Sequence, residues 1–186
     1  MKKFLFAISI AVLGGLSVMC TSAQEKEIAI VAHRGYWNCD AAGSAKNSIA
    51  SLAQAQELGV WGSEFDVNLT EDGVLLVFHD GTVDGKRIEK NPASAFADHR
   101  LKNGERIPVI DEYLEQAKKN PKTMLVYELK KHSCDSVETK AVDASIAKLK
   151  EYGLFDHEHE MYISFSEYIC KEFADKGPGF TVRYLE

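Results

Sequence analysis

The chain has 186 residues, of which 45% are hydrophobic, and a formal net charge of −6 at pH 7. This length and composition suit one globular core, or most of a larger one, and exclude a disordered or fibrous chain. The basic residues are not massed in one segment, so we expect no nucleic-acid partner.

The N-terminus has the pattern of an export signal. Two lysines precede the apolar run FLFAISIAVLGGLSVM, and small residues follow at Thr21 and Ala23. This order predicts a signal peptide over residues 1–23 and a mature domain over residues 24–186, exported to the periplasm or secreted. The run is shorter than the roughly 20 residues that cross a bilayer comfortably, so we expect no stable membrane span. A lipid anchor at Cys20 is the alternative, but bulky Met19 fits that pattern poorly.

Three cysteines lie in the predicted mature domain, at Cys39, Cys134 and Cys170. Export would place them in an oxidising compartment, where disulfides persist. Because three is an odd number, at least one should stay free or pair between chains. The sequence leaves their pairing open.

Strands and helices alternate along the rest of the chain. Short apolar runs predict strands over residues 27–33, 61–69, 74–80, 123–130, 161–165 and 180–185. Amphipathic patterns predict helices over residues 47–59, 107–120, 136–153 and 166–177, the first capped by Asn47 or Ser48 and ended by Gly59. This alternation predicts a parallel sheet with helices outside.

Two acidic residues interrupt the apolar run at 61–69. Glu64 and Asp66 alternate with Phe65 and Val67, so both carboxylates point to the same face of the predicted strand. Burying an unpaired carboxylate costs several kcal/mol or forces it to take up a proton. The two carboxylates therefore need a partner.

Further polar side chains fall at the ends of other predicted strands. His33 follows the first strand, His79 ends the third, and Glu128 and Lys130 end the fourth. In a barrel of parallel strands these ends meet at one mouth, where such enzymes keep their active sites. Three carboxylates gathered there repel one another unless a cation holds them, and an all-oxygen site favours Ca²⁺ or Mg²⁺.

Each of these features alone has an ordinary structural explanation. A lone histidine at a strand end is more often structural than catalytic. The acidic pair fits a solvated edge, and Glu128 with Lys130 fits a surface salt bridge. The combination, in order along successive strands, favours a functional site.

The residues that carry this pattern resemble the glycerophosphodiester phosphodiesterase family. The matching segments, in order and spacing, are AHRG (32–35), NS (47–48), GSEFDVNLTEDGVLLVFHD (62–80), IPVIDEYL (107–114) and YELK (127–130). The family pattern has an acidic residue before the asparagine, where this chain has Lys46. The resemblance implies a TIM barrel enzyme that uses a divalent cation to hydrolyse a glycerophosphodiester, its small-molecule substrate, into an alcohol and sn-glycerol 3-phosphate.

The resemblance also implies a role for each residue of the site. Two histidines would transfer protons, three residues would bind the substrate phosphate, and three carboxylates would hold the cation. The histidines are His33 and His79. The phosphate-binding residues are Arg34, Lys130 and Asn47, and the carboxylates are those of Glu64, Asp66 and Glu128.

The number of predicted strands, six, is below the eight of a closed (β/α)₈ barrel. We therefore expect a barrel that is incomplete at its C-terminal end, with exposed strand edges, a tendency to associate and little activity on its own. Three functions stay open: the glycerophosphodiester phosphodiesterase, a related phospholipase- or sphingomyelinase D-like phosphodiesterase, and an inactive remnant or binding module. The sequence does not fix the head group, the metal or the oligomeric state.

Overall fold

The structure, a computed structural model, describes residues 28–186. The predicted signal peptide, residues 1–23, lies outside the described residues. Between residues 28 and 186, no helix is both long enough and apolar enough to cross a membrane.

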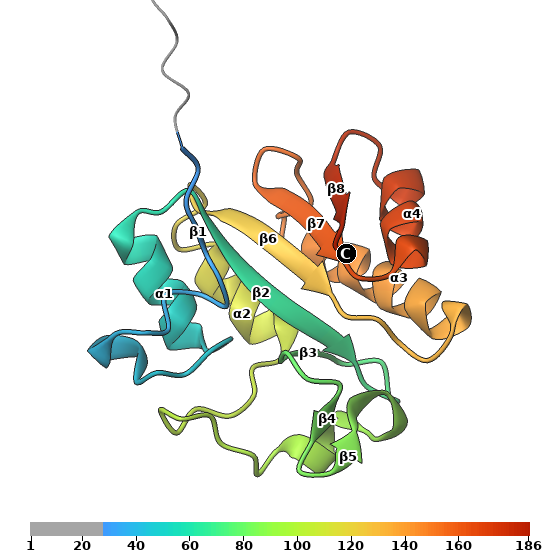
Figure 1. Ribbon diagram of the computed structural model, residues 1–186, viewed down its shortest axis with the longest axis horizontal. Coiled ribbons are helices and arrows are strands. Elements are labelled where there is room, and N and C mark those ends of the chain that lie inside the picture. Colours follow the sequence, from blue (N-terminus) through green and yellow to red (C-terminus); the bar gives the residue numbers. More distant parts are fainter. Residues whose placement is uncertain (1–27) are drawn as a thin grey trace, which may run out of the picture.

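Five neighbouring strands form a parallel sheet, as the alternating pattern predicts (Figure 1). Their spatial order is β1 (Val31–Ala32), β2 (Gly62–Leu69), β6 (Met124–Leu129), β7 (Glu160–Ser164) and β8 (Thr181–Tyr184). Each strand lies within one of the segments predicted from the sequence, apart from one residue at the start of β7. The order follows the chain, which is what successive crossover connections in a barrel give.

Four helices connect the parallel strands and cover one face of the sheet (Figure 1). They are α1 (Ile49–Leu58), α2 (Ile110–Ala117), α3 (Asp135–Glu151) and α4 (Glu167–Lys176). Ser48 caps α1 by accepting a hydrogen bond from the Ser51 N–H, and Gly59 ends it in the left-handed conformation, as predicted.

The main core lies between the helices and the sheet. Phe65 and Val67 of β2 pack there with Tyr127 of β6 and with helix side chains that include Leu52 and Leu114. Because side chains alternate along a strand, Glu64 and Asp66 must point to the opposite face of the sheet, which is the inner face in a barrel. Packing of the apolar residues thus fixes the direction of the acidic ones.

The third predicted strand differs from the expectation. Only Leu75–Val77 of the segment 74–80 forms a strand, β3, and it runs antiparallel to β2. The chain reverses in a tight turn in which the Thr70 N–H donates to the carbonyl of Val74 at 2.9 Å. A parallel neighbour needs a crossover of a dozen or more residues, so this short turn permits only a hairpin. The sheet has six strands, but the third is not a barrel strand.

A small additional layer follows β3 beside the C-terminal end of β2 (Figure 1). It contains the hairpin β4 (Thr82–Val83) and β5 (Lys86–Arg87) and two 3-10 helices, η2 (Ile88–Lys90) and η3 (Ala93–Phe96). A separate cluster of buried side chains holds it together: Leu76, Val83, Ile88, Phe96 and Ile107. A further 3-10 helix, η1, spans Asp40–Ala42. None of these elements falls in a segment predicted from the sequence to be a strand or a helix, apart from β3 itself.

The three cysteines of the described residues, Cys39, Cys134 and Cys170, are all unpaired. This agrees with the expectation that at least one stays free. Cys134 is exposed at the N-terminus of α3, and the other two are partly buried.

Candidate active site

Three carboxylates meet on the inner face of β2 and β6. Glu64 and Asp66 are 4% and 0% exposed, and Glu128 is 6% exposed. The parallel register sets Asp66 directly opposite Glu128, which is why residues 62 positions apart in the chain share one site. One oxygen from each carboxylate lies within 4.8 Å of the other two. The sequence-predicted metal ligands are therefore brought together.

Two basic side chains partly balance this negative charge. Lys130 Nζ lies 2.5 Å from Glu128 Oε1 and 3.1 Å from Asp66 Oδ1. Burial lowers the pKa of Lys130, but the Glu128 and Asp66 carboxylates outweigh burial and raise the pKa above its ordinary value, so the ammonium stays charged. Arg34 Nε lies 3.4 Å from Asp66 Oδ2 and makes no hydrogen bond to a described residue.

Glu64 is the carboxylate that lacks a full set of partners. Its Oε2 accepts a hydrogen bond from the Arg34 backbone N–H at 2.7 Å, while its Oε1 is buried without a partner among the described residues. Burial, and then the charge of Asp66, raise the pKa of Glu64 to about 8. A buried oxygen in this state needs a proton or a cation, and the oxygen-only donor set fits a hard divalent cation.

A strained loop after β1 brings Arg34 into the site. Arg34 and Gly35 both have positive φ, 59° and 75°. A Cβ on Gly35 would lie 2.5 Å from the Ser51 hydroxyl oxygen, so only glycine fits between the loop and α1. The Gly35 N–H donates to the carbonyl of Glu64 at 3.1 Å, which ties the loop to β2. Backbone strain of this kind is typical of functional sites.

Asn47 closes the other end of the same loop. Its φ is 57°, and its N–H donates to the carbonyl of Arg34 at 3.1 Å. The Asn47 amide nitrogen donates to Asp66 Oδ2 at 2.8 Å, and its amide oxygen accepts the Asp66 N–H at 3.2 Å. Both polar atoms of the amide are thus engaged with Asp66, so Asn47 orients that carboxylate.

His33 stands at the rim of the cluster. Its side chain is 70% exposed, and its Nε2 lies 3.8 Å from Glu64 Oε2. Partial burial, and then the charge of Arg34, lower the pKa of His33 below its ordinary value. The lowered pKa favours the neutral imidazole, which is the form able to accept a proton.

His79 reaches the site through the β2–β3 hairpin and not at the end of a barrel strand. The Phe78 N–H donates to the carbonyl of Asp66 at 2.9 Å, which places the next residue beside the cluster. His79 Nδ1 lies 2.6 Å from Asp80 Oδ1, so Asp80 fixes the ring and leaves Nε2 free. Asp80 is a supporting residue that the sequence analysis did not single out, although a carboxylate directly after a histidine is the signal for it.

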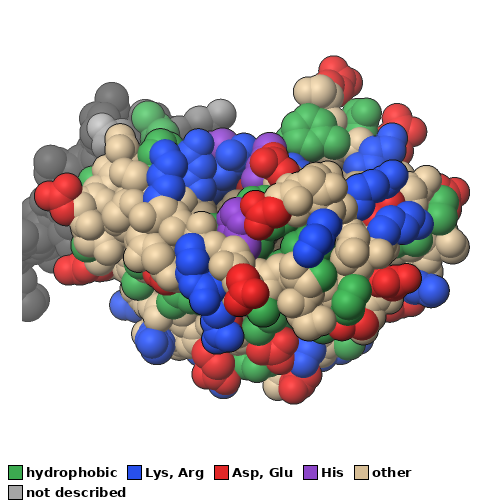
Figure 2. All heavy atoms as spheres, turned by 90° about the horizontal axis from the view of Figure 1, so that it is seen from below, with side chains coloured by type: hydrophobic (Ala, Val, Ile, Leu, Met, Phe, Trp, Pro, Cys, Tyr) green, Lys and Arg blue, Asp and Glu red, His purple; other side chains and the backbone are tan. Residues whose placement is uncertain are grey.

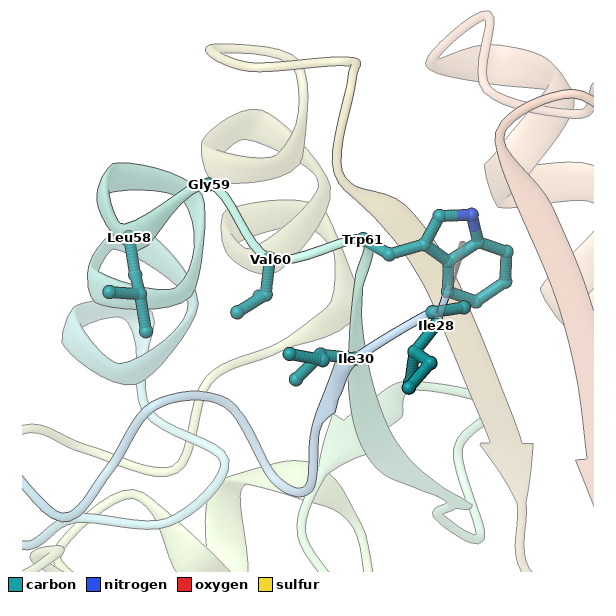
Figure 3. Close-up of a pocket in the computed structure, with 7 residues that line it drawn as sticks. Ile28, Ile30, Leu58, Gly59, Val60 and Trp61 are labelled. Carbon is teal, nitrogen blue, oxygen red and sulfur yellow. The ribbon is translucent and has the colours of Figure 1, made fainter. Parts of the chain in front are cut away.

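The C-terminal ends of β2 and β6 open on a polar face of the molecule. Figure 2 shows this face, on which histidine side chains lie close to Lys and Arg and to Asp and Glu. A cavity of about 650 Å³ lies instead beside the N-terminal ends of β1 and β2 and is lined by Ile28, Ala29, Ile30, Leu58, Gly59, Val60 and Trp61 (Figure 3). Among the described residues, no ionisable side chain lines this cavity, whereas the carboxylate cluster lies at the other end of the strands.

The fold defines the class of protein, an α/β protein whose parallel sheet has the strand order of a (β/α)₈ barrel. Solved structures confirm the expected fold. A glycerophosphodiester phosphodiesterase from Parabacteroides distasonis is similar with a TM-score of 0.78 and 42% identity, over 83% of this chain and 63% of that one. A phosphodiesterase from Oleispira antarctica, in complex with the product sn-glycerol-3-phosphate, is similar with a TM-score of 0.65 and 25% identity, over 83% and 64%.

Sequence comparison gives the family. The model of the glycerophosphoryl diester phosphodiesterase family matches residues 33–179, and this chain belongs to that family. A curated glycerophosphodiester phosphodiesterase from Caldanaerobacter subterraneus subsp. tengcongensis is 31% identical over 171 residues, which are 84% of this chain and 65% of the relative. The chain thus spans less than two thirds of the length of that relative.

Proposed function

We propose that this protein is a metal-dependent phosphodiesterase that hydrolyses glycerophosphodiesters to an alcohol and sn-glycerol 3-phosphate. The observation that carries the proposal is the buried cluster of Glu64, Asp66 and Glu128 beside two histidines and two basic side chains. Family membership and the product bound to the Oleispira antarctica relative support it.

The carboxylate cluster would hold one Ca²⁺ or Mg²⁺ ion. The fit rests on the buried, unpartnered Glu64 Oε1 and on the oxygen-only donor set. When bound, the cation supplies positive charge next to the phosphate oxygens, on which negative charge grows in the transition state. Asn47 keeps Asp66 in a single orientation toward this position.

Lys130 and Arg34 would bind the substrate phosphate. Both already border Asp66, and Lys130 remains charged in the site. A phosphate oxygen that approaches the cluster would find these donors preorganised, which is the arrangement that lowers the barrier of phosphoryl chemistry. Asn47 would border the same phosphate pocket.

The two histidines would carry the proton transfers. The lowered pKa of His33 suits it to accept the proton of the attacking hydroxyl. Asp80 holds Nδ1 of His79, so Nε2 is the nitrogen that would donate a proton to the departing alkoxide. These assignments leave Glu64, Asp66 and Glu128 to the cation.

The decisive experiment is a head-group release assay. Choline, ethanolamine and glycerol are measured after incubation with the corresponding sn-glycero-3-phosphodiesters, with and without excess EDTA. We expect turnover that EDTA abolishes and that Ca²⁺ or Mg²⁺ restores. Release of a head group from sphingomyelin or lysophospholipid alone would favour the phospholipase- or sphingomyelinase D-like alternative, and no turnover with intact cation binding would favour a binding module.

A matched pair of variants locates the chemistry. Glu64→Gln removes a carboxyl that can ionise to bind the cation, whereas Glu160→Gln changes an equally buried carboxyl of β7 whose Oε2 accepts the Tyr162 hydroxyl. We expect Glu64→Gln to weaken cation binding and lose turnover, and Glu160→Gln to keep both. Full turnover of the wild type in excess EDTA would contradict the metal assignment.

We also propose that residues 1–23 direct export and that residues 24–186 are the phosphodiesterase-like domain, located in the periplasm or medium. N-terminal sequencing of the protein recovered from the periplasm or medium tests this. A mature N-terminus at Gln24 is expected, and retention of Met1 in the cytoplasm would contradict it.

A further inference from the structure

His132 takes the place of a backbone carbonyl at the mouth end of the sheet. The Lys130 N–H donates to the carbonyl of Val67 at 2.9 Å, so Val67 directs its backbone groups toward β6. Leu69, two residues later, directs its own groups to the same side. Its N–H does not continue the ladder to a backbone oxygen. It donates to Nε2 of His132 at 3.0 Å, and the bond is buried.

The backbone of His132 is held from the other side by α3. The His132 N–H donates to Glu138 Oε1 at 3.0 Å, and Glu138 Oε2 accepts the Ser166 hydroxyl at 2.6 Å. Ser166 is the N-cap of α4. One chain of buried hydrogen bonds therefore joins the ends of β2 and β6 to the starts of α3 and α4.

The hydrogen bond from Leu69 fixes the protonation of the imidazole. Since Nε2 accepts, the ring proton is on Nδ1, and a second proton on Nε2 would face the Leu69 N–H. His132 is 8% exposed, and burial lowers its pKa, against the charges of Glu89 and Glu138 and the backbone of Lys130. The neutral ring is therefore the form that matches this site.

The hydrogen bond from Leu69 reaches His132, which lies two residues after Lys130, the proposed phosphate ligand. Lys130 is the first residue after β6, and its ammonium lies between Asp66 and Glu128. The Lys130 N–H ties this residue to Val67, and a second anchor beyond it keeps the segment after the strand end from moving the flexible lysine side chain. The bond from Leu69 to His132 closes this segment onto β2.

We propose that His132 is a positioning residue for Lys130, which it holds toward the phosphate by accepting the Leu69 N–H. The inference rests on the proposed function, because it takes Lys130 as a phosphate ligand. It adds a residue that no part of the sequence pattern marked. His132 does not touch the reacting atoms. Replacing it should therefore weaken phosphate binding and leave the affinity for the cation unchanged.

Three substitutions of His132 separate this role from simple packing. Glutamine places an oxygen near the position of Nε2, so His132→Gln keeps an acceptor for the Leu69 N–H. Asparagine is one bond shorter, so His132→Asn keeps the polarity and loses the reach. His132→Leu removes the acceptor altogether. The measurement is the dissociation constant for sn-glycerol 3-phosphate by calorimetry, with Mg²⁺ present and with the full chain.

We expect His132→Asn and His132→Leu to bind sn-glycerol 3-phosphate about tenfold more weakly, the size of one lost charge-assisted hydrogen bond, and His132→Gln to stay within about twofold. Affinity for Mg²⁺ alone should not change. Ser145→Ala is the control, because it removes an equally buried hydrogen bond, from the Tyr127 hydroxyl at 2.9 Å, away from the mouth. It should lower the melting temperature and leave product binding unchanged.

Equal product affinity in wild type, His132→Gln and His132→Asn would overturn the proposal. If His132→Leu does not fold, the glutamine and asparagine variants decide alone. Imidazole ¹⁵N chemical shifts of the wild type give a second measurement, because Nε2 must be the unprotonated nitrogen at pH 7. A wild type that binds the cation and no sn-glycerol 3-phosphate would instead refute the proposed function, while the ¹⁵N shifts would still test the contact with Leu69.

Discussion

Binding of a divalent cation is expected to release a proton from Glu64. Burial and the charge of Asp66 raise the pKa of Glu64 to about 8 in the cation-free site. At pH 7 roughly nine in ten of these carboxyl groups are therefore protonated. A carboxyl must be ionised to bind the cation, so about 0.9 proton should leave per cation at pH 7 and about 0.5 at pH 8.

This exchange of a proton on Glu64 for the cation also sets how the affinity for the cation depends on pH. Below pH 8 the cation competes with the proton, so apparent affinity should rise about tenfold for each pH unit and level off above pH 8. Calorimetric titrations with Mg²⁺ in two buffers of different ionisation enthalpy give the number of protons released. The matched variants Glu64→Gln and Glu160→Gln show where the proton comes from, because only Glu64→Gln should abolish the release.

Two results would refute this reasoning. One is cation binding at pH 7 with no proton released, which would mean that Glu64 is already ionised beside Asp66. The other is release that persists in Glu64→Gln, which would assign the proton to another carboxyl of the cluster.

Three further predictions follow from the same geometry. His33→Ala and His79→Ala should each lower turnover by roughly 10² to 10⁴-fold while Mg²⁺ affinity stays near that of the wild type; a lost affinity in calorimetry would make the histidine a ligand. Gly35→Ala should lower the melting temperature and the turnover together, because a Cβ would lie 2.5 Å from the Ser51 hydroxyl at a φ of 75°; unchanged values for both would contradict the loop geometry. Without cation, the melting temperature should fall as pH rises from 4.5 toward about 8, since the pKa values of Glu160 and Glu64 are both raised from 4.5 to about 8 and the folded state keeps protons that the unfolded state has released. Glu160→Gln should therefore reduce this slope by about half, and an unchanged slope would contradict the assignment.

The sequence predicted the parts of the fold that depend on local periodicity. The alternation of Glu64 and Asp66 with Phe65 and Val67 predicted which face of β2 carries the carboxylates, and the structure agrees. Helix α1 ends at Gly59, whose positive φ is the reason that a glycine stands there. These features need only neighbours in the chain, so they are visible in the sequence.

The segment 74–80 shows where periodicity alone misled. Its apolar residues suit a buried strand of either direction, and the direction was set by the length of the connection after β2. Only residues 70–73 separate the two predicted strands, and a connection this short is compatible with a hairpin but not with a crossover to a parallel strand.

The supporting contacts could not be predicted from the sequence. Glu138 lies inside α3, where an acidic residue ordinarily faces solvent, yet it is 2% exposed and bonds to His132 and Ser166. Nothing in its local sequence indicates this, because the partners belong to a loop and to the next helix. Such contacts depend on how α3 and α4 pack on the sheet.

All three carboxylates of the cluster belong to β2 and β6, which are direct neighbours in the sheet. The chain between these strands, residues 70–123, leaves from one end of β2 and returns at the start of β6, and it carries the β4–β5 hairpin and α2 on the way. Insertions and deletions within this excursion leave Asp66 opposite Glu128, whereas one residue added inside either strand would turn its carboxylates toward the helices. In evolutionary terms, the part of this segment that follows His79 and Asp80 can be remodelled for new substrates while the two strands keep the carboxylates in place, and a scan of single-residue insertions would map that boundary.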